Sequence, residues 1–300
     1  MTFDKPQVAT IGFFDGVHKG HQHVVNAVID EARRRGMESM VITFDRHPRS
    51  VVDTGYMPQM LSTIDDKLQL FSLTALDNCV VLPFDAEMAM FTAKQFMTDV
   101  LMPQLNVKVL MIGYDNHFGH RISDEEGFDD YVDYGKQIGI EVLRADEKTV
   151  QGVDVSSSVI RAFISEGEMQ KASACLGRQY MIRGTVVTGH KIGRELGFPT
   201  ANIDPSSVQT MIPSAGVYAV KVRIAGDDAV RRGVMNIGSR PTFDDGAVSL
   251  EVHIIDFTGD LYGKTLSVYF DYRIREEKKF SSKEELIKQL RKDVEQTIQV

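Results

Sequence analysis

Apolar and polar positions follow two different patterns along the chain, and the pattern changes near residue 180. In the first half, short apolar runs are separated by longer stretches whose apolar residues recur at helical spacing. This predicts a parallel sheet covered by helices on both faces. The expected strands are Val8–Ile11, Ser39–Phe44, Cys79–Leu82, Val107–Ile112 and Ile140–Leu143. The expected helices are His21–Arg35, Ile64–Thr74, Thr92–Met102 and Glu126–Ile138. Ligands of such sheets bind beyond the C-terminal ends of the strands, which is where chemistry is expected.

In the second half, the pattern has period two, and the strands follow one another without helices between them. The expected strands are Tyr180–Val187, Gly216–Ile224, Arg231–Ile237, Leu250–Ile255 and Leu266–Arg273. Five or six short strands at this spacing favour a small closed antiparallel barrel. A last helix, Lys283–Ile298, is expected to have Ser282 as its N-cap, with Glu285 completing a capping box. We therefore predict two domains, residues 1–180 and residues 181–300.

Composition and charge reduce the number of function classes that fit the sequence. An apolar fraction of 43% and 25% charged residues are ordinary for a globular protein, and 300 residues suit about two domains. The net charge of −8 argues against a nucleic acid as the main ligand. Residues 1–7 lack the apolar core of a signal peptide, and no apolar run approaches membrane-spanning length. Cys79 and Cys175 lie in apolar surroundings, so we expect reduced, buried cysteines and a cytoplasmic protein.

The first expected strand turns into a helix at a segment with two histidines, His18 and His21. The start of a helix offers unpaired N–H groups and a positive dipole end, which together favour phosphate. Glycines at positions 12, 16 and 20 would let a ligand approach the backbone. Imidazoles placed there can donate hydrogen bonds to a phosphorus centre as negative charge builds during displacement. The alternatives are a His-rich surface turn and an adventitious metal site that adds His23, although no paired cysteines or carboxylate cluster support a metal.

Three further segments of the first half carry polar residues. Thr43–Pro48 follows the second strand, where proline holds the preceding residue extended, and an ordinary loop is the alternative. Gly113–Arg121 follows the fourth strand, and an acid with aromatic residues at a strand end suits a ribose hydroxyl and a stacked ring. In Val155–Arg161, serines that cap a helix also place hydroxyl and N–H groups beside Arg161, at a second anion site.

Two features of the second half are also of chemical interest. Gly189–Gly197 is a glycine-bearing loop between strands. The overlapping string Gly184–Lys191 is not a phosphate loop of the Walker A type, because no lysine directly follows its second glycine and no long helix comes next. A simple hairpin loop is the alternative. Glu251 alternates with the apolar Leu250 and Val252, so it points to the opposite side of its strand, which in a barrel is outward.

Together these segments resemble the motifs of the prokaryotic bifunctional riboflavin kinase/FAD synthetases. The string Gly12–Gln22 is similar to their nucleotidyltransferase signature, and the three segments that follow it keep the family's order. In the second half, Phe198–Asn202 resembles the riboflavin kinase motif, and further matches continue through Gly263. The resemblance runs from Val8 to the last helix. It implies an α/β nucleotidyltransferase domain with a Rossmann-like parallel sheet, followed by a small antiparallel β-barrel domain with a C-terminal helix.

Three positions depart from the family's pattern. Phe13 stands where many members have Asn, and Asn116 replaces the first phenylalanine of a Gly-x-Asp-Phe-x-Phe-Gly motif. Ser158 replaces a threonine and keeps the hydroxyl. The two histidines of the signature are retained.

The resemblance implies a role for each matched residue. As catalytic groups, His18 and His21 would stabilise the α-phosphate transition state, Arg161 would bind the departing pyrophosphate, and Glu251 would take the ribityl hydroxyl proton. The residues implied to bind nucleotide are Gly12, Phe14, Asp15, Gly16, Gly20, Ser157, Ser158, Gly189, Gly193, Thr200 and Asn202. The residues implied to bind flavin are His47, Pro48, Asp115, Phe118 and Arg275. Thr200 and Asn202 would also hold Mg²⁺, with ATP as the co-substrate.

We therefore expect a cytoplasmic enzyme that phosphorylates riboflavin to FMN and then adenylylates FMN to FAD, releasing pyrophosphate. Its partners would be riboflavin, FMN and ATP, with no nucleic acid and no membrane; the number of subunits is left open. One alternative is an enzyme with only one of these activities, its other half being a flavin-binding or docking module. The other is a non-catalytic flavin sensor, which the presence of Glu251 and both signature histidines disfavours, because binding alone needs no base.

Overall fold

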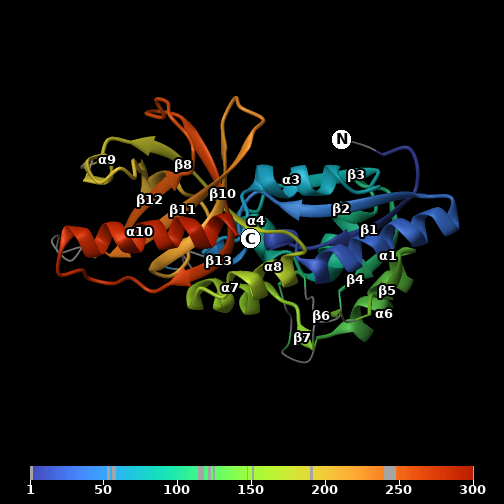
Figure 1. Ribbon diagram of the computed structural model, residues 1–300. Helices are drawn as coiled ribbons and strands as arrows, with labels where there is room; N and C mark the ends of the chain where they lie inside the picture. Colours follow the sequence, from blue (N-terminus) through green and yellow to red (C-terminus); the bar gives the residue numbers. More distant parts are fainter. Residues whose placement is uncertain are drawn as a thin grey trace. The chain divides into compact units, whose positions relative to one another are not determined.

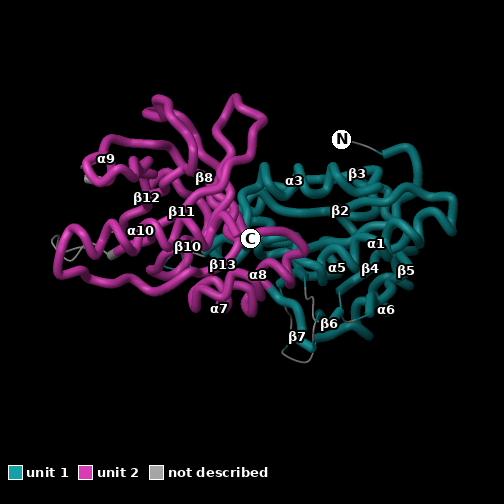
Figure 2. Tube along the Cα trace, in the orientation of Figure 1, with its two compact units in different colours: residues 1–156 teal, residues 157–300 magenta. Residues whose placement is uncertain are grey.

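The computed structural model describes residues 3–52, 55, 59–113, 118–120, 123, 126–146, 148–150, 152–189, 192–239 and 248–299. The chain forms two compact units, residues 1–156 and residues 157–300 (Figure 2). Each unit has its own sheet and its own buried core. Within the described ranges, none of the helices has the length and apolar character that a membrane crossing requires.

A five-stranded parallel sheet forms the centre of the first unit. Its strands are β1 (Gln7–Ile11), β2 (Glu38–Phe44), β3 (Asn78–Leu82), β4 (Val107–Ile112) and β5 (Glu141–Arg144). Their order across the sheet is β3-β2-β1-β4-β5, and every neighbouring pair is parallel (Figure 1). The predicted strands are therefore confirmed. Along the chain, β2 and β3 are added on one side of β1, and β4 and β5 on the other. The strand order thus reverses between β1 and β4, so a ligand is expected beyond the C-terminal ends of these two strands.

Helices cover both faces of this sheet. The longer ones are α1 (Lys19–Arg35), α3 (Ile64–Ser72) and α6 (Phe128–Ile138), where helices were predicted. The remaining predicted helix is divided into α5 (Ala93–Phe96) and a π-helical segment, η2 (Met97–Leu101). Short elements that the periodicity did not indicate are η1 (Asp15–Val17), α2 (Arg49–Val52), α4 (Ala86–Met90) and the hairpin of β6 (Thr149–Val150) and β7 (Val153–Asp154).

The core of this unit explains why the central strands are uninterrupted apolar runs. Ile11, Ile42 and Leu110 pack on one face of the sheet with residues of α5, η2 and α6. Val8 and Val41 point to the opposite face, where α1 and α3 cover them. Since both faces of a parallel sheet are buried, no polar alternation is needed along its strands.

The two cysteines have different environments. Cys175 is buried as predicted, whereas Cys79 is exposed, so the prediction for Cys79 is wrong. The physical reason is the position of β3, which is an edge strand with β2 on one side only. An apolar run therefore does not ensure burial at the edge of a sheet.

The second unit is built around a closed six-stranded barrel. Its strands are β8 (Tyr180–Val187), β9 (Ala201–Ile203), β10 (Gly216–Ile224), β11 (Val230–Ser239), β12 (Val248–Ile254) and β13 (Thr265–Arg275). They close in the order β10-β11-β12-β9-β8-β13, with every neighbouring pair antiparallel. The predicted barrel is confirmed, and β9 is the strand that the pattern did not indicate. Tyr180, Val220 and Phe270 are at most 2% exposed and belong to its apolar interior.

Helices flank this barrel in the chain. In order they are α7 (Ser157–Glu166), α8 (Met169–Leu176), α9 (Ile192–Glu195), η3 (Pro205–Ser207) and α10 (Lys283–Ile298). Ser282 caps α10 as predicted, because its hydroxyl accepts a hydrogen bond from the N–H of Glu285 at 3.2 Å. The predicted capping box is incomplete. The Glu285 carboxylate accepts from the Ser281 hydroxyl at 2.8 Å and from the Ser281 N–H, instead of from Ser282.

Candidate functional site

The segment between β1 and α1 places two histidines at the start of a helix. His18 is the N-cap of α1, and its Nδ1 accepts a hydrogen bond from the backbone N–H of His21 at 3.3 Å. The two rings are stacked, with their centroids 3.5 Å apart and their planes 19° apart. Since Nδ1 is an acceptor, neutral His18 carries its proton on Nε2, which is the donor that the ring can offer a ligand.

Gly20 makes this stacked arrangement possible. A methyl group on Gly20 would lie 3.1 Å from Nδ1 of His18 and 3.2 Å from the carbonyl oxygen of Val155. The His-x-Gly-His spacing therefore has a steric reason: the His18 ring folds back over a position where a side chain would be crowded. The same contact shows that the end of the first unit, at Val155, lies against the first turn of α1.

His21 is held in its neutral form. Burial, the charge of His18 and the charge of Lys67, in that order, keep its pKa well below the usual value. Its Nδ1 is buried, and the described residues provide no hydrogen-bond partner for it. A neutral imidazole can donate one hydrogen bond without giving up a proton, which suits stabilisation of charge that develops on a neighbouring group.

The turn that leads to the histidines has a strained backbone. Phe14 and Val17 have positive φ angles of 53° and 40°, which side-chain-bearing residues rarely adopt. The Asp15 carboxylate helps to hold this shape, because it accepts hydrogen bonds from the N–H groups of Leu61 at 3.0 Å and Ser62 at 3.2 Å. Asp15 is 3% exposed, so in this structure it fixes the turn. Its contact with nucleotide stays a prediction.

Two more residues that were predicted to bind nucleotide make contacts within this turn. The Phe14 ring lies edge-on to the His21 ring, with centroids 5.1 Å apart. The backbone N–H of Gly16 donates to the Ser62 hydroxyl at 2.9 Å. Both residues therefore shape the turn, and their contact with a nucleotide also stays a prediction.

Lys67 of α3 reaches the same turn, although no sequence motif marks it. Its ammonium donates to the carbonyl oxygen of Phe13 at 2.9 Å, and the residue is 1% exposed. The one sequence signal was its position four residues before the buried Phe71, on the same face of α3. That signal is weak, because a lysine in an amphipathic helix is ordinarily exposed.

A cavity of about 420 Å³ lies beyond the C-terminal ends of the parallel strands. It brings together four residues of the predicted sites, namely Gly12, His47, Pro48 and Phe118. Phe13 also lines it and packs against the His47 ring, with centroids 4.8 Å apart. Aromatic walls of this kind suit a flat ring system.

The remaining predicted residues of the first site are not brought into this cavity. Asp115 lies outside the described residues. Ser157, Ser158 and Arg161 lie in the first two turns of α7, which belongs to the second unit. Their predicted contact with pyrophosphate stays a prediction.

In the second unit, polar side chains lie side by side across three barrel strands. Asn202 of β9 is paired with Glu251 of β12, and Glu251 is paired with Asn236 of β11. Thr200, just before β9, donates from Oγ1 to Oε2 of Glu251 at 3.5 Å. Glu251 is half-buried and points outward from the barrel, as the alternation predicted, but into a cavity instead of into open solvent.

The glycine-bearing loop packs directly on these residues. A methyl group on Gly189 would overlap the side chain of Asn202. One on Gly193 would overlap the carbonyl oxygen of Phe198 and lie 3.2 Å from the Thr200 hydroxyl. Only glycine lets the loop lie this close to Thr200 and Asn202.

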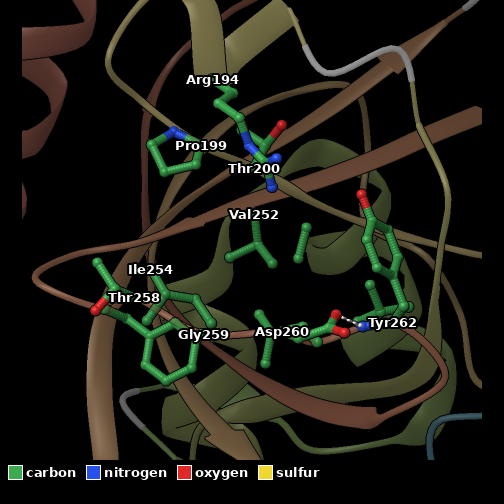
Figure 3. Close-up of a pocket in the computed structure, with 13 residues that line it drawn as sticks. Arg194, Pro199, Thr200, Val252, Ile254, Thr258, Gly259, Asp260 and Tyr262 are labelled. Carbon is green, nitrogen blue, oxygen red and sulfur yellow. Dashed lines mark hydrogen bonds between the residues drawn. The ribbon is translucent and has the colours of Figure 1, made fainter.

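Two cavities meet at Thr200, which lines both. One, of about 460 Å³, has Arg194 and Thr200 on one side and Asp260 and Tyr262 on the other (Figure 3). The other, of about 320 Å³, contains Glu251 and is walled by apolar side chains of α10. Glu251 lines only the smaller cavity, and it contacts Thr200, the residue that the two cavities share.

Arg275 lines the smaller cavity, but its guanidinium is bound to Asp293 of α10. Nε and Nη2 of Arg275 lie 3.1 and 2.9 Å from Oδ2 of Asp293, which is fully buried. Gln289 donates to the other carboxylate oxygen at 2.8 Å. The ion pair thus joins the end of β13 to the helix that walls the cavity. A direct contact of Arg275 with flavin stays a prediction.

A parallel-sheet unit with imidazoles at a helix start, and a barrel unit with a carboxylate in a cavity beside Thr200, define a two-site transferase that handles phosphate groups. Comparison with known families identifies which one. The FAD synthetase family model matches residues 1–159, and the riboflavin kinase family model matches residues 176–300. The chain belongs to the family of bifunctional riboflavin kinase/FMN adenylyltransferases.

Similar proteins match nearly the whole chain. The bifunctional riboflavin kinase/FMN adenylyltransferase of Escherichia coli strain K12 is 36% identical over 289 residues, covering 95% of this chain and 90% of the relative. That of Listeria monocytogenes is 37% identical over 297 residues, covering 98% and 92%. A crystal structure described as a macrolide-efflux protein from Streptococcus pneumoniae has 31% sequence identity and a TM-score of 0.88, covering 99% of this chain and 95% of that one. The predicted family and the predicted fold class are confirmed.

Proposed function

We propose that the barrel unit phosphorylates riboflavin to FMN and that the sheet unit adenylylates FMN to FAD, with ATP as the second substrate of both reactions. The observation that carries this division is that each unit has its own cavity, with His18 and His21 in the first unit and Glu251 in the second. The two family models support the same pair of activities. Riboflavin, FMN and ATP are accordingly the substrates.

In the kinase reaction, the smaller barrel cavity takes riboflavin and the larger one takes ATP. Phe198, Phe280 and the apolar residues of α10 give the smaller cavity walls that suit a flat ring. The two cavities meet at Thr200, where the ribityl hydroxyl and the γ-phosphate must come together. Glu251 accepts the hydroxyl proton as the oxygen attacks the γ-phosphorus, and ADP leaves.

Thr200 and Asn202 are proposed to hold Mg²⁺ together with ATP. Their hydroxyl and amide oxygens are hard donors, and because Gly189 lacks a side chain, the Asn202 amide can occupy its position against the loop. When bound, Mg²⁺ would neutralise charge on the transferred phosphoryl group and take its other ligands from water and phosphate.

In the adenylylation reaction, FMN occupies the cavity beyond the parallel strands, against His47, Pro48 and Phe118. An oxygen of the FMN phosphate attacks the α-phosphorus of ATP, and the bond from that phosphorus to the pyrophosphate oxygen breaks. His18, through its Nε2–H, and neutral His21 donate hydrogen bonds to the charge that builds on the α-phosphate.

The pyrophosphate contacts are proposed for Ser157, Ser158 and Arg161, which the family resemblance supports. The functional division then assigns residues 1–180 to adenylylation and residues 181–300 to phosphorylation, although α7 and α8 cluster with the barrel in space. We propose a cytoplasmic location, which the two free cysteines support.

One incubation tests the function: the purified protein with riboflavin, ATP and Mg²⁺, its products separated by chromatography. We expect FMN first and FAD afterwards. An enzyme with a single activity would stop at one reaction, and a flavin sensor would bind flavin without consuming ATP.

The Glu251→Gln variant tests the division of labour. FMN formation should fall by about 10²–10⁴-fold, since a positioned general base is lost. Conversion of supplied FMN to FAD should continue at the wild-type rate. Loss of both reactions in a folded variant, or of neither, would contradict the assignment of the base.

A further inference from the structure

Lys67 is a buried lysine that no step of the proposed function uses. It is 1% exposed, and its Nζ donates to the Phe13 carbonyl oxygen at 2.9 Å and to the Thr43 hydroxyl at 3.4 Å. The ammonium also lies 3.8 Å from the centroid of the Phe13 ring. In the described part of the chain, no carboxylate lies within ion-pair distance of it. Lysine is almost never buried to this degree without such a partner, so its charge calls for a reason.

The contacts of Lys67 are directed at the turn that carries the histidines. The Phe13 carbonyl oxygen accepts two hydrogen bonds, one from the Lys67 ammonium and one from the Thr43 hydroxyl at 3.1 Å. The Asp15 carboxylate binds the same segment, Leu61–Lys67, through two of its backbone N–H groups. The segment Leu61–Lys67 therefore holds the strained turn at two points, Phe13 and Asp15.

The charge of Lys67 also acts on the start of α1. It is one of the three causes that lower the pKa of His21. Burial lowers the pKa of Lys67 itself to about 8, against the opposing effects of Asp15 and Cys79. At neutral pH the site therefore combines a neutral imidazole with a buried cation. A charge in such a low-dielectric position acts more strongly on a bound anion than a surface lysine does.

We infer that Lys67 is a positioning residue of adenylyl transfer: it fixes the turn that presents His18 and His21, and its buried charge favours ATP phosphates at the start of α1. The inference rests on the proposed adenylylation by the first unit. Lys67 is 1% exposed and binds Phe13 and Thr43, so it acts through the turn and through its electric field.

The Lys67→Met variant tests this, because methionine keeps a long apolar stem and removes the charge. In FMN adenylylation, kcat/KM for ATP should fall by about tenfold or more, as expected when a preorganised charge near a developing anion is lost. Riboflavin phosphorylation in the same sample should be unchanged, as should both reactions in Lys136→Met, which alters an exposed lysine of α6 paired with exposed Asp133. The Lys67→Arg variant keeps the charge and should recover part of the loss. Wild-type kcat/KM for ATP in folded Lys67→Met protein would overturn the inference.

A second measurement needs no variant. The groups that face Lys67 are Asp15 in η1, His21 in α1 and Cys79 in β3. The pKa of His21 is lowered and partial desolvation raises the pKa of Cys79 to about 11, which leaves Lys67 to titrate near 8. The KM for ATP in adenylylation should therefore rise as the pH increases from about 7 to 10, because the cation loses its proton. A KM that stays constant over this range would overturn the inference even if Lys67→Met does not fold. A wild-type protein that makes no FAD would instead overturn the proposed function, and the inference with it.

Discussion

Single glycines decide whether the polar groups of each site can take up their positions. A methyl group at position 20 would lie 3.1 Å from Nδ1 of His18 and 3.2 Å from the Val155 carbonyl oxygen. In a Gly20→Ala variant, the His18 ring or the Val155 carbonyl must therefore shift by a few tenths of an ångström. We expect the rate of FAD formation from FMN to fall by about 10- to 100-fold, because a small misplacement of a catalytic group has effects of this size. Chromatography of the products measures it.

The matched control lies in the other unit. In Gly189→Ala, the new methyl group would overlap the Asn202 side chain, so FMN formation should fall while adenylylation continues. Each variant thus serves as the control for the other. If either substitution reduced both rates equally in a folded protein, the steric argument for separate sites would be wrong.

Single residues also show which contacts the sequence could indicate and which it could not. The position of His18 and His21 at a helix start is a local feature, so the sequence predicted it, although the hydrogen bond from the His21 N–H to His18 was not predicted. The contact of Lys67 with Phe13 joins positions 54 residues apart, and nothing in either segment points to the other. The bond between Arg275 and Asp293 was missed for the same reason: Asp293 occurs among the polar residues of an amphipathic helix, and only the fold makes it fully buried.

Among the elements, length decided which ones the pattern predicted. The long strands and α10 agree with the periodicity within a few residues, because many positions contribute to the pattern. β9 has three residues, too few to establish a period of two, yet its register places Asn202 beside Glu251. The element that completes the kinase site was therefore found through its motif, not through its periodicity.

The attachment of α10 to the barrel gives a prediction about stability. Asp293→Asn removes the charge that neutralises the largely buried Arg275 guanidinium. The free energy of unfolding should fall by about 3 kcal/mol, since breaking a buried ion pair leaves an uncompensated charge. The KM for riboflavin should rise, because α10 walls the smaller cavity. Urea unfolding and steady-state kinetics measure the two effects.

Glu295→Gln is the control on the same helix, because Glu295 is exposed and its substitution should change neither quantity. If the Asp293 and Glu295 variants unfolded at the same urea concentration, the ion pair would not be what fastens α10. In that case, the apolar contacts of Leu286, Leu290 and Val294 would have to account for its position.

For the whole molecule, the proposed function places the two reactions in separate cavities. The cavity beyond the parallel strands is lined by residues of the first unit, and both barrel cavities are lined by residues of the second. FMN is the product of one site and the substrate of the other. It must therefore leave the barrel before it can be adenylylated.

This separation can be tested with two variants that each lack one reaction. Given riboflavin and ATP, Glu251→Gln should make no appreciable FAD because it lacks FMN, and His21→Ala should stop at FMN. Mixed together, they should make FAD after a lag, since FMN released by the barrel of one chain can enter the sheet unit of the other. The lag should shorten as the concentration of the His21→Ala protein rises. Suppose the mixture makes no FAD while each variant alone retains its one remaining reaction. FMN would then have to pass between the two sites of a single chain without release, and the two units could not act as independent catalysts.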